Sequence, residues 1–167
     1  RCYLELGRLS VSLGKVEESS RWLYRARDSF MEMSHYGGLA ETYLAIYRAQ
    51  PLLNPGTADE GLLTRVMKAA QKAGNMDLLA ESWRERGLIA VRREDETLAL
   101  TYFNQEIRAR RRTRNIAALA DGHLRMAVLY MRQNSYLAAG TEVLRAQALA
   151  RAHLEREEIP SRLDEIL

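Results

Sequence analysis

Apolar residues recur along most of this chain at offsets of three and four, which is the spacing of one face of an α-helix. Residues 16–33 form one such stretch. Short segments typical of loops separate the stretches at residues 34–37, 74–75 and 113–115. The pattern therefore predicts an all-α chain of at least eight antiparallel helices without strands.

A longer periodicity groups these helices into units. One helix position returns every 40 residues and is occupied by Gly7, Tyr47, Gly87 and Ala127. Twelve residues further on, three units have a small residue: Ser19, Ala99 and Ala139. Four residues beyond that, the same units have an apolar residue: Leu23, Phe103 and Val143. Small residues where two helices cross let the helices approach closely. Each unit is therefore predicted to be a hairpin of two consecutive helices that pack against each other.

Each hairpin would leave one apolar face open, and stacking of successive hairpins would bury it. We therefore expect one repeat domain over residues 1–167, with repeats at about 1–36, 37–75, 76–115 and 116–158. The segment 159–167 contains Leu163, Ile166 and Leu167 in phase with a fifth first helix, which predicts a capping helix or a truncated repeat. The chain does not begin with Met, so we expect it to be a fragment of a longer protein.

The matching positions resemble the motif of the tetratricopeptide repeat (TPR) family. The first unit matches at Tyr3, Leu6, Gly7, Gly14, Ser19, Leu23 and Ala26; the third at Trp83, Gly87, Ala99 and Phe103; the fourth at His123, Ala127, Tyr130, Ala139, Val143 and Ala146. The period of 40 exceeds the usual 34, as in the long variants found in kinesin light chains. The resemblance implies a right-handed α-solenoid of about four helix-turn-helix repeats plus a C-terminal helix.

The second unit departs most from the motif. Pro51, Pro55 and Gly56 interrupt it, so we expect a long, irregular loop between its two helices. Asp59 stands where the other units have a small residue. Thr57 and Glu60 have the spacing of a capping box, which predicts that the second helix restarts at this point.

Composition excludes several classes of protein. The 25 Lys and Arg residues against 22 Asp and Glu give a formal net charge of +3, too small to indicate nucleic-acid binding by itself. No apolar run approaches the roughly 18–20 residues of a membrane-spanning helix. The single cysteine, Cys2, rules out an internal disulfide and fits a reducing compartment. We therefore expect a cytoplasmic protein that does not act on membranes.

Catalytic and metal-binding signatures are absent from the sequence. His35, His123 and His153 are too far apart for the ligand spacing of a helical metal site. There is no phosphate-binding loop, dinucleotide-binding glycine motif or nucleophile elbow. We therefore expect neither an enzyme nor a cofactor.

In the TPR family the first helix of each repeat lines a concave groove that binds peptides. The resemblance places the following residues there: Leu4, Arg8, Val11, Ser12, Glu41, Leu44, Arg48, Glu81, Arg84, Leu88, Val91, Arg92, Asp121, Leu124, Val128, Met131 and Arg132. Arginines above an apolar floor suit a segment that is acidic and partly apolar. The alternative is that these arginines are surface residues paired with neighbouring acids.

A second candidate site is the arginine run, defined as Arg108, Arg110, Arg111, Arg112 and Arg114. Five guanidinium groups in seven residues could bind phosphates or an acidic protein surface. They also fall at a predicted helix end, where the macrodipole and the free carbonyls favour cations. No aromatic residues interleave the run, so stacking on nucleic-acid bases is unsupported.

The sequence thus predicts a scaffold module that binds another protein or a peptide with acidic and apolar residues, and self-association stays open. One alternative is a regulatory sensor or oligomerisation segment of a larger signalling or transcription-control protein. Another is a helical-repeat RNA binder, although we expect no nucleic-acid partner.

Overall fold

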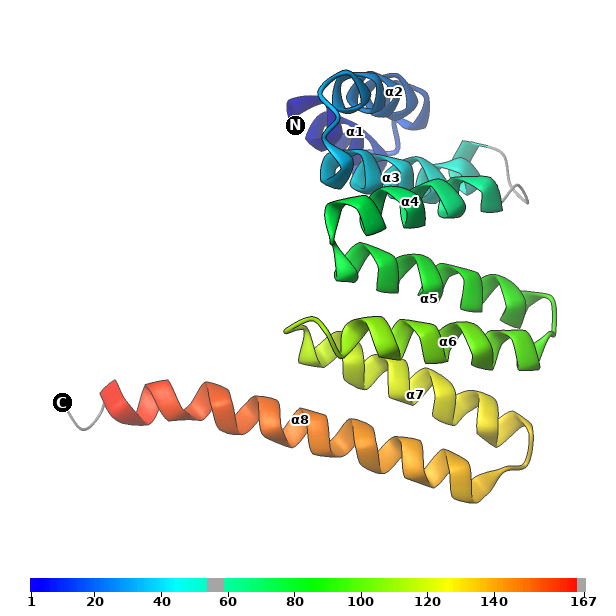
Figure 1. Ribbon diagram of the computed structural model, residues 1–167, viewed down its shortest axis with the longest axis vertical. Coiled ribbons are helices and arrows are strands. Elements are labelled where there is room, and N and C mark those ends of the chain that lie inside the picture. Colours follow the sequence, from blue (N-terminus) through cyan, green and yellow to red (C-terminus); the bar gives the residue numbers. More distant parts are fainter. Residues whose placement is uncertain (54–58, 165–167) are drawn as a thin grey trace. The chain divides into compact units, whose positions relative to one another are not determined.

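The computed structural model describes residues 1–53 and 59–164. These residues form eight α-helices and no strand, which confirms the all-α prediction (Figure 1). In chain order the helices are α1 (Cys2–Ser12), α2 (Val16–Glu32), α3 (Tyr36–Leu53), α4 (Glu60–Ala73), α5 (Met76–Arg92), α6 (Glu96–Arg110), α7 (Ile116–Arg132) and α8 (Tyr136–Asp164).

The helix boundaries confirm the 40-residue period. Three first helices begin at equivalent residues, Tyr36, Met76 and Ile116. Two second helices, α6 and α8, begin at Glu96 and Tyr136, which are also 40 residues apart. The eight helices therefore form four sequential pairs, consistent with four helix-turn-helix repeats.

The chain forms two compact units whose boundary lies within α5. We call Arg1–Arg86 the N-terminal unit and Gly87–Leu167 the C-terminal unit. In the N-terminal unit, α1 packs on α2, α2 on α3, and α3 on α4. In the C-terminal unit, α6 packs on α7 and α7 on α8.

Glycine at the repeated position allows a close crossing of two helices. A Cβ atom added to Gly7 of α1 would lie 2.6 Å from Cδ2 of the buried Leu23 on α2. The Ser19 hydroxyl also donates a 2.8 Å hydrogen bond to the carbonyl oxygen of Gly7. In the C-terminal unit, a Cβ on Gly87 would collide with the buried ring of Phe103. In both units the bulky residue of the second helix occupies the space that the missing side chain leaves.

The second repeat follows the period but has a shorter second helix. By the 40-residue period α4 would begin near residue 56, yet it begins at Glu60. Its N-cap is Asp59, whose carboxylate accepts a 2.8 Å hydrogen bond from the Gly61 N–H. The capping box predicted at Thr57 and Glu60 is therefore wrong, because the N-cap of the helix is Asp59. Thr57 itself lies outside the described residues. Asp59 replaces a buried small residue because this helix lacks the turn that would bury it.

The expected interruption of this repeat at Pro51 is also wrong. Helix α3 continues through Pro51 and ends at Leu53. The predicted irregular loop falls mostly on residues 54–58, which lie outside the described residues.

The end of the chain differs from the prediction of a separate helix at 159–167. Helix α8 runs without a break through Pro160 to Asp164, so residues 159–164 are its last part. Residues 165–167 lie outside the described part of the chain. With 29 residues against the 17 of α7, α8 extends well past the start of α7 (Figure 1).

Apolar side chains from consecutive helices form the core of the C-terminal unit. The buried cluster consists of Ala90, Ala99, Phe103, Ile107, Met126 and Leu129. Ala99, predicted to lie at a helix crossing, is completely buried, and its counterpart Ala139 is 2% exposed. The packing of second helices against first helices in this core determines which first-helix residues are exposed.

Candidate peptide-binding surfaces

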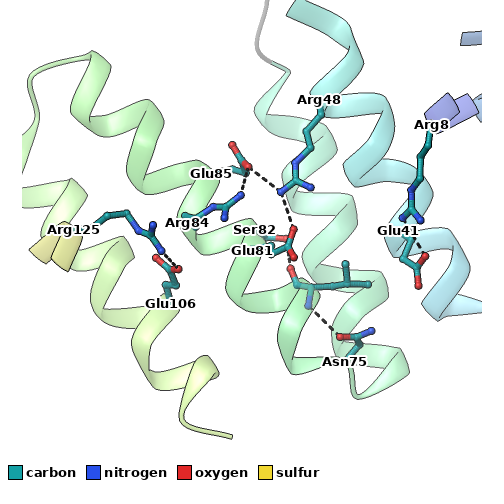
Figure 2. A network of polar contacts seen from close by, with 11 residues as sticks. Arg8, Glu41, Arg48, Asn75, Glu81, Ser82, Arg84, Glu85, Glu106 and Arg125 are labelled. Carbon is teal, nitrogen blue, oxygen red and sulfur yellow. Dashed lines mark hydrogen bonds and ion pairs between the residues drawn. The ribbon is translucent and has the colours of Figure 1, made fainter. Parts of the chain in front are cut away.

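Ion pairs connect the first helices of the N-terminal unit. The Arg8 guanidinium on α1 lies 3.2 Å from Glu41 on α3 (Figure 2). It also lies 3.1 Å from Glu5 on its own helix. Forty residues later, Arg48 on α3 lies 2.7 Å from Glu81 on α5. Each of the two cross-helix pairs joins residues 33 apart in sequence, so the repeat carries the same ion pair twice.

Two further contacts complete this network (Figure 2). Arg48 also lies 3.2 Å from Glu85, and Arg84 lies 3.2 Å from the same carboxylate oxygen. Arg8, Arg48 and Arg84 are therefore all paired within the chain. These three arginines were predicted to line the groove. In the structure they are instead paired with neighbouring acids, which was the alternative interpretation of the sequence.

A shallow cavity of about 270 Å³ lies between α1 and α3 beside these pairs. We call it the N-terminal groove, and its lining is Arg8, Val11, Leu23, Glu41, Leu44, Ala45, Arg48 and Ala49. Five of these residues were assigned to the groove from the sequence. Leu4 and Leu44, however, are only 1% and 4% exposed, because they pack into the core. Neither offers a partner much side-chain surface.

The ion-pair pattern changes in the C-terminal unit. Leu88 holds the position of Arg8 and Arg48, and Asp121 holds the position of their acidic partners. Leu88 is half-buried and packs against the core cluster. Asp121 is exposed and makes no ion pair within the described residues. The third copy of the cross-helix pair is therefore lost.

On α7 an apolar residue, Val128, stands at the position of Arg8 and Arg48 and is part of an exposed apolar stripe. Leu124, Val128 and Met131 are between 45% and 56% exposed, and their offsets of four and three put them on one helix face. We call these three residues the α7 stripe. Arg132 follows it directly and is exposed, as is Arg92 at the end of α5. Neither arginine makes an ion pair with another described residue, so both guanidinium groups can bind a ligand.

The arginine run is less available than the sequence suggests. Arg108, Arg111, Arg112 and Arg114 are exposed, but Arg110 is only 3% exposed. Its inclusion in an acidic-partner patch is therefore wrong, because its side chain is packed inside the C-terminal unit. Arg108 and Arg110 lie in the last turn of α6, and Arg111 is its C-cap. The run thus lies where a helix end favours cations.

Sequence reasoning missed two buried polar contacts in the C-terminal unit. Glu106 is fully buried, and the Arg125 guanidinium donates to its carboxylate at 2.7 Å (Figure 2). On α7, His123 Nδ1 lies 2.5 Å from Glu142 Oε2. A signal did exist for Glu106, because the equivalent positions hold the apolar residues Ala26, Val66 and Ala146. An isolated acid in an apolar series indicates a buried partner.

Within the described residues no His, Cys, Asp and Glu side chains gather in groups of three that could hold a metal ion. In the same part of the chain, no helix combines the length and the apolar character needed to cross a membrane.

No model of a known protein family matches this chain, and no curated protein does. Among solved structures, the chain is similar to the crystal structure of BtubC (BKLC) from P. vanneervenii, with a TM-score of 0.74 and 15% sequence identity. The match covers 90% of this chain and 63% of that one, so this chain spans less than two thirds of the BtubC chain. At this identity the likeness concerns the fold alone: both chains are built from packed helical repeats.

Proposed function

We propose that this chain is a scaffold module that binds a peptide segment of another protein. The binding surface consists of the α7 stripe with Arg132, together with Leu88, Val91 and Arg92 at the end of α5. The observation that carries the proposal is an exposed apolar stripe followed on the same helix by Arg132, which, like Arg92 at the end of α5, no described acid neutralises.

The repeat supports placing these residues of α5 and α7 on one surface. In the N-terminal unit, a residue of one first helix contacts the residue 33 positions later on the next first helix, as Arg8 contacts Glu41. By the same offset Leu88 is the neighbour of Asp121, which lies one turn before Leu124 on α7. Leu88 and Val91 also pack against the core cluster that contains residues of α7.

The chemistry of the surface indicates the character of its ligand. Burial of Leu124, Val128 and Met131 would supply much of the affinity, and Met adapts its shape to different partners. Arg92 and Arg132 would pair with carboxylates and set the orientation of the bound segment. The expected ligand is therefore an amphipathic segment with acidic and apolar residues.

Peptide display with the 167-residue chain as bait tests this function. Selection should enrich sequences that combine Asp or Glu with Leu, Ile or Phe. Val128→Asp should abolish the enrichment without a change in helical content, because Val128 is exposed and not part of the core. If selection returns no consensus, or if the Val128→Asp variant selects the same peptides, the proposal fails.

Charge reversal separates the proposed surface from the arginine run. Arg92→Glu with Arg132→Glu should weaken binding of a selected peptide, whereas exposed charges contribute little to folding stability. The matched control is Arg111→Glu with Arg112→Glu, two exposed members of the run. Binding that is lost in the control and kept in the first variant would move the site to the arginine run.

A further inference from the structure

A further cavity lies in the N-terminal unit, between α3 and α4, and has a volume of about 360 Å³. Other helices of the chain adjoin this hairpin on both sides. Helix α3 packs on α2, and Arg86 of α5 donates a 2.7 Å hydrogen bond to the Thr64 hydroxyl of α4. The cavity is therefore not a surface that the ends of the sequence leave open. We call it the α3–α4 pocket, and its lining includes Tyr36, Leu39 and Tyr43 of α3 and Arg65, Lys68 and Lys72 of α4.

The α3 side of the pocket is apolar and aromatic. Tyr43 is 9% exposed, Leu39 is half-buried, and Tyr36 at the start of α3 is 37% exposed. Within the described residues the Tyr43 hydroxyl has only a weak partner, the sulfur of Met31 at 4.0 Å. Small-molecule sites typically combine an apolar lining with a few polar groups that fix the orientation of the ligand. This side of the pocket therefore suits the apolar part of a ligand.

The α4 side of the pocket is positively charged. Arg65, Lys68 and Lys72 are exposed, and their offsets of three and four put them on one helix face. None of them forms an ion pair with another described residue. The Lys72 ammonium lies 4.7 Å from the centroid of the Tyr36 ring, a contact that positions the cation and leaves its charge in place. No Asp or Glu lines the pocket, so three positive charges meet there without an acid.

This charge pattern is specific to the second repeat. The equivalent positions hold Arg25, Asp28 and Glu32 in α2, Gln105, Arg108 and Arg112 in α6, and Arg145, Ala148 and Ala152 in α8. A helix C-terminus favours a cation in its last turn, which accounts for Lys72. Arg65 lies more than two turns before the end of α4 at Ala73, outside the reach of this effect. The three cations of α4 are therefore more than a helix-end preference.

We propose that the α3–α4 pocket binds a small organic phosphate monoester. The phosphate lies among Arg65, Lys68 and Lys72, and the apolar group of the ester lies on Leu39 and Tyr43. A phosphate monoester carries a charge of about −1.5 to −2 at neutral pH, so it balances three cations better than the single charge of a carboxylate. This site is separate from the proposed peptide-binding surface, because none of the pocket's residues belongs to that surface.

Isothermal titration of the 167-residue chain with phenyl phosphate tests the site. We expect saturable binding of one molecule per chain at pH 7.5. Inorganic phosphate lacks the apolar group and should bind at least about tenfold more weakly. At pH 5.5 the affinity for phenyl phosphate should fall about fourfold, because the second pKa of a phosphate monoester is about 6 and most of the dianion is then protonated.

Neutralising pairs of cations shows where the phosphate binds. Lys68→Gln with Lys72→Gln should weaken phenyl phosphate binding at least about tenfold, because two charge-assisted hydrogen bonds are lost. Both side chains are exposed, so the helical content should not change. The matched control is Arg111→Gln with Arg112→Gln, which removes the same charge from exposed residues of the arginine run and should bind like the parent.

Three results would overturn the proposal: no saturable binding to the parent chain, equal affinity for phenyl phosphate and inorganic phosphate, or a loss of binding in the control variant alone. The last result would place the phosphate at the arginine run. Binding of a display-selected peptide should be the same in the Lys68→Gln/Lys72→Gln chain as in the parent, so the phosphate site and the peptide-binding surface can fail independently.

Discussion

The first helices of the two units use equivalent positions in opposite ways. In the N-terminal unit, Arg8 and Arg48 reach acids on the next first helix and are neutralised there. In the C-terminal unit, the same positions hold Leu88 and Val128, and Val128 is 56% exposed. The arginine that recurs at this position thus forms an ion pair with the next first helix. Val128, an exposed apolar residue at the same position, forms no such ion pair. This difference is the reason why we propose the peptide-binding surface in the C-terminal unit.

The ion pairs of the two units differ as well. The Arg8 and Glu41 side chains are 45% and 36% exposed, whereas the side chain of Glu106, the partner of Arg125, has no exposed surface. Water screens an exposed pair, so its contribution to stability is small. A buried carboxylate depends on the groups that face it. We therefore expect the stability of the chain to depend far more on Arg125 than on Arg8 or Arg48.

The largest expected effect is that of Arg125→Leu. The substitution leaves the buried Glu106 carboxylate without the guanidinium that donates to it at 2.7 Å. The free energy of unfolding should fall by about 3 kcal/mol, the lower end for breaking a buried pair. Urea denaturation measures this change. Arg132→Leu is the control and should alter stability by no more than about 0.5 kcal/mol; equal effects would mean that Glu106 does not need Arg125.

A smaller effect is expected from a methyl group at the two helix crossings. In Gly87→Ala the new Cβ collides with the buried ring of Phe103, which is rigid. The free energy of unfolding should therefore fall by about 2 kcal/mol. In Gly7→Ala the new Cβ meets the Leu23 side chain, which has rotamers to adjust, so we expect about 1 kcal/mol. Thermal unfolding of both variants gives the comparison, and the reverse order would contradict the rigid-ring explanation.

The smallest effect concerns the exposed pair of the N-terminal unit. A double-mutant cycle with Arg48→Ala and Glu81→Ala should give a coupling energy of about 0.2–1 kcal/mol. In 1 M salt the coupling should largely vanish, because the Debye length falls to about 3 Å. A coupling above about 2 kcal/mol that resists salt would show that this network is structurally dominant, and the contrast with Glu106 would disappear.

The fold was predictable from the sequence because small and bulky residues alternate in phase. Gly7 with Leu23 and Gly87 with Phe103 already indicate close crossings 80 residues apart. The start of α4 was not predictable in this way, since Asp59 and Thr57 are both good caps and only the backbone decides between them.

The candidate surface was predictable only in part. The repeat placed Arg8, Arg48, Val128 and Met131 on first helices, but it could not show which arginines are neutralised. Whether an arginine is neutralised depends on an acid 33 residues later, which lies on the next first helix. The burial of Arg110 was also hidden, because a run of arginines at a helix end normally lies in solvent.

The most direct measurement of the central claim compares matched pairs of arginines in the two units. A fluorescent peptide from the display selection would be titrated with the parent chain, with Arg92→Gln/Arg132→Gln and with Arg8→Gln/Arg48→Gln. The account predicts about tenfold weaker binding for the first variant, a loss of roughly 1.4 kcal/mol, and an unchanged Kd for the second. Weaker binding only after the change in Arg8 and Arg48 would contradict it and would place the site in the N-terminal groove.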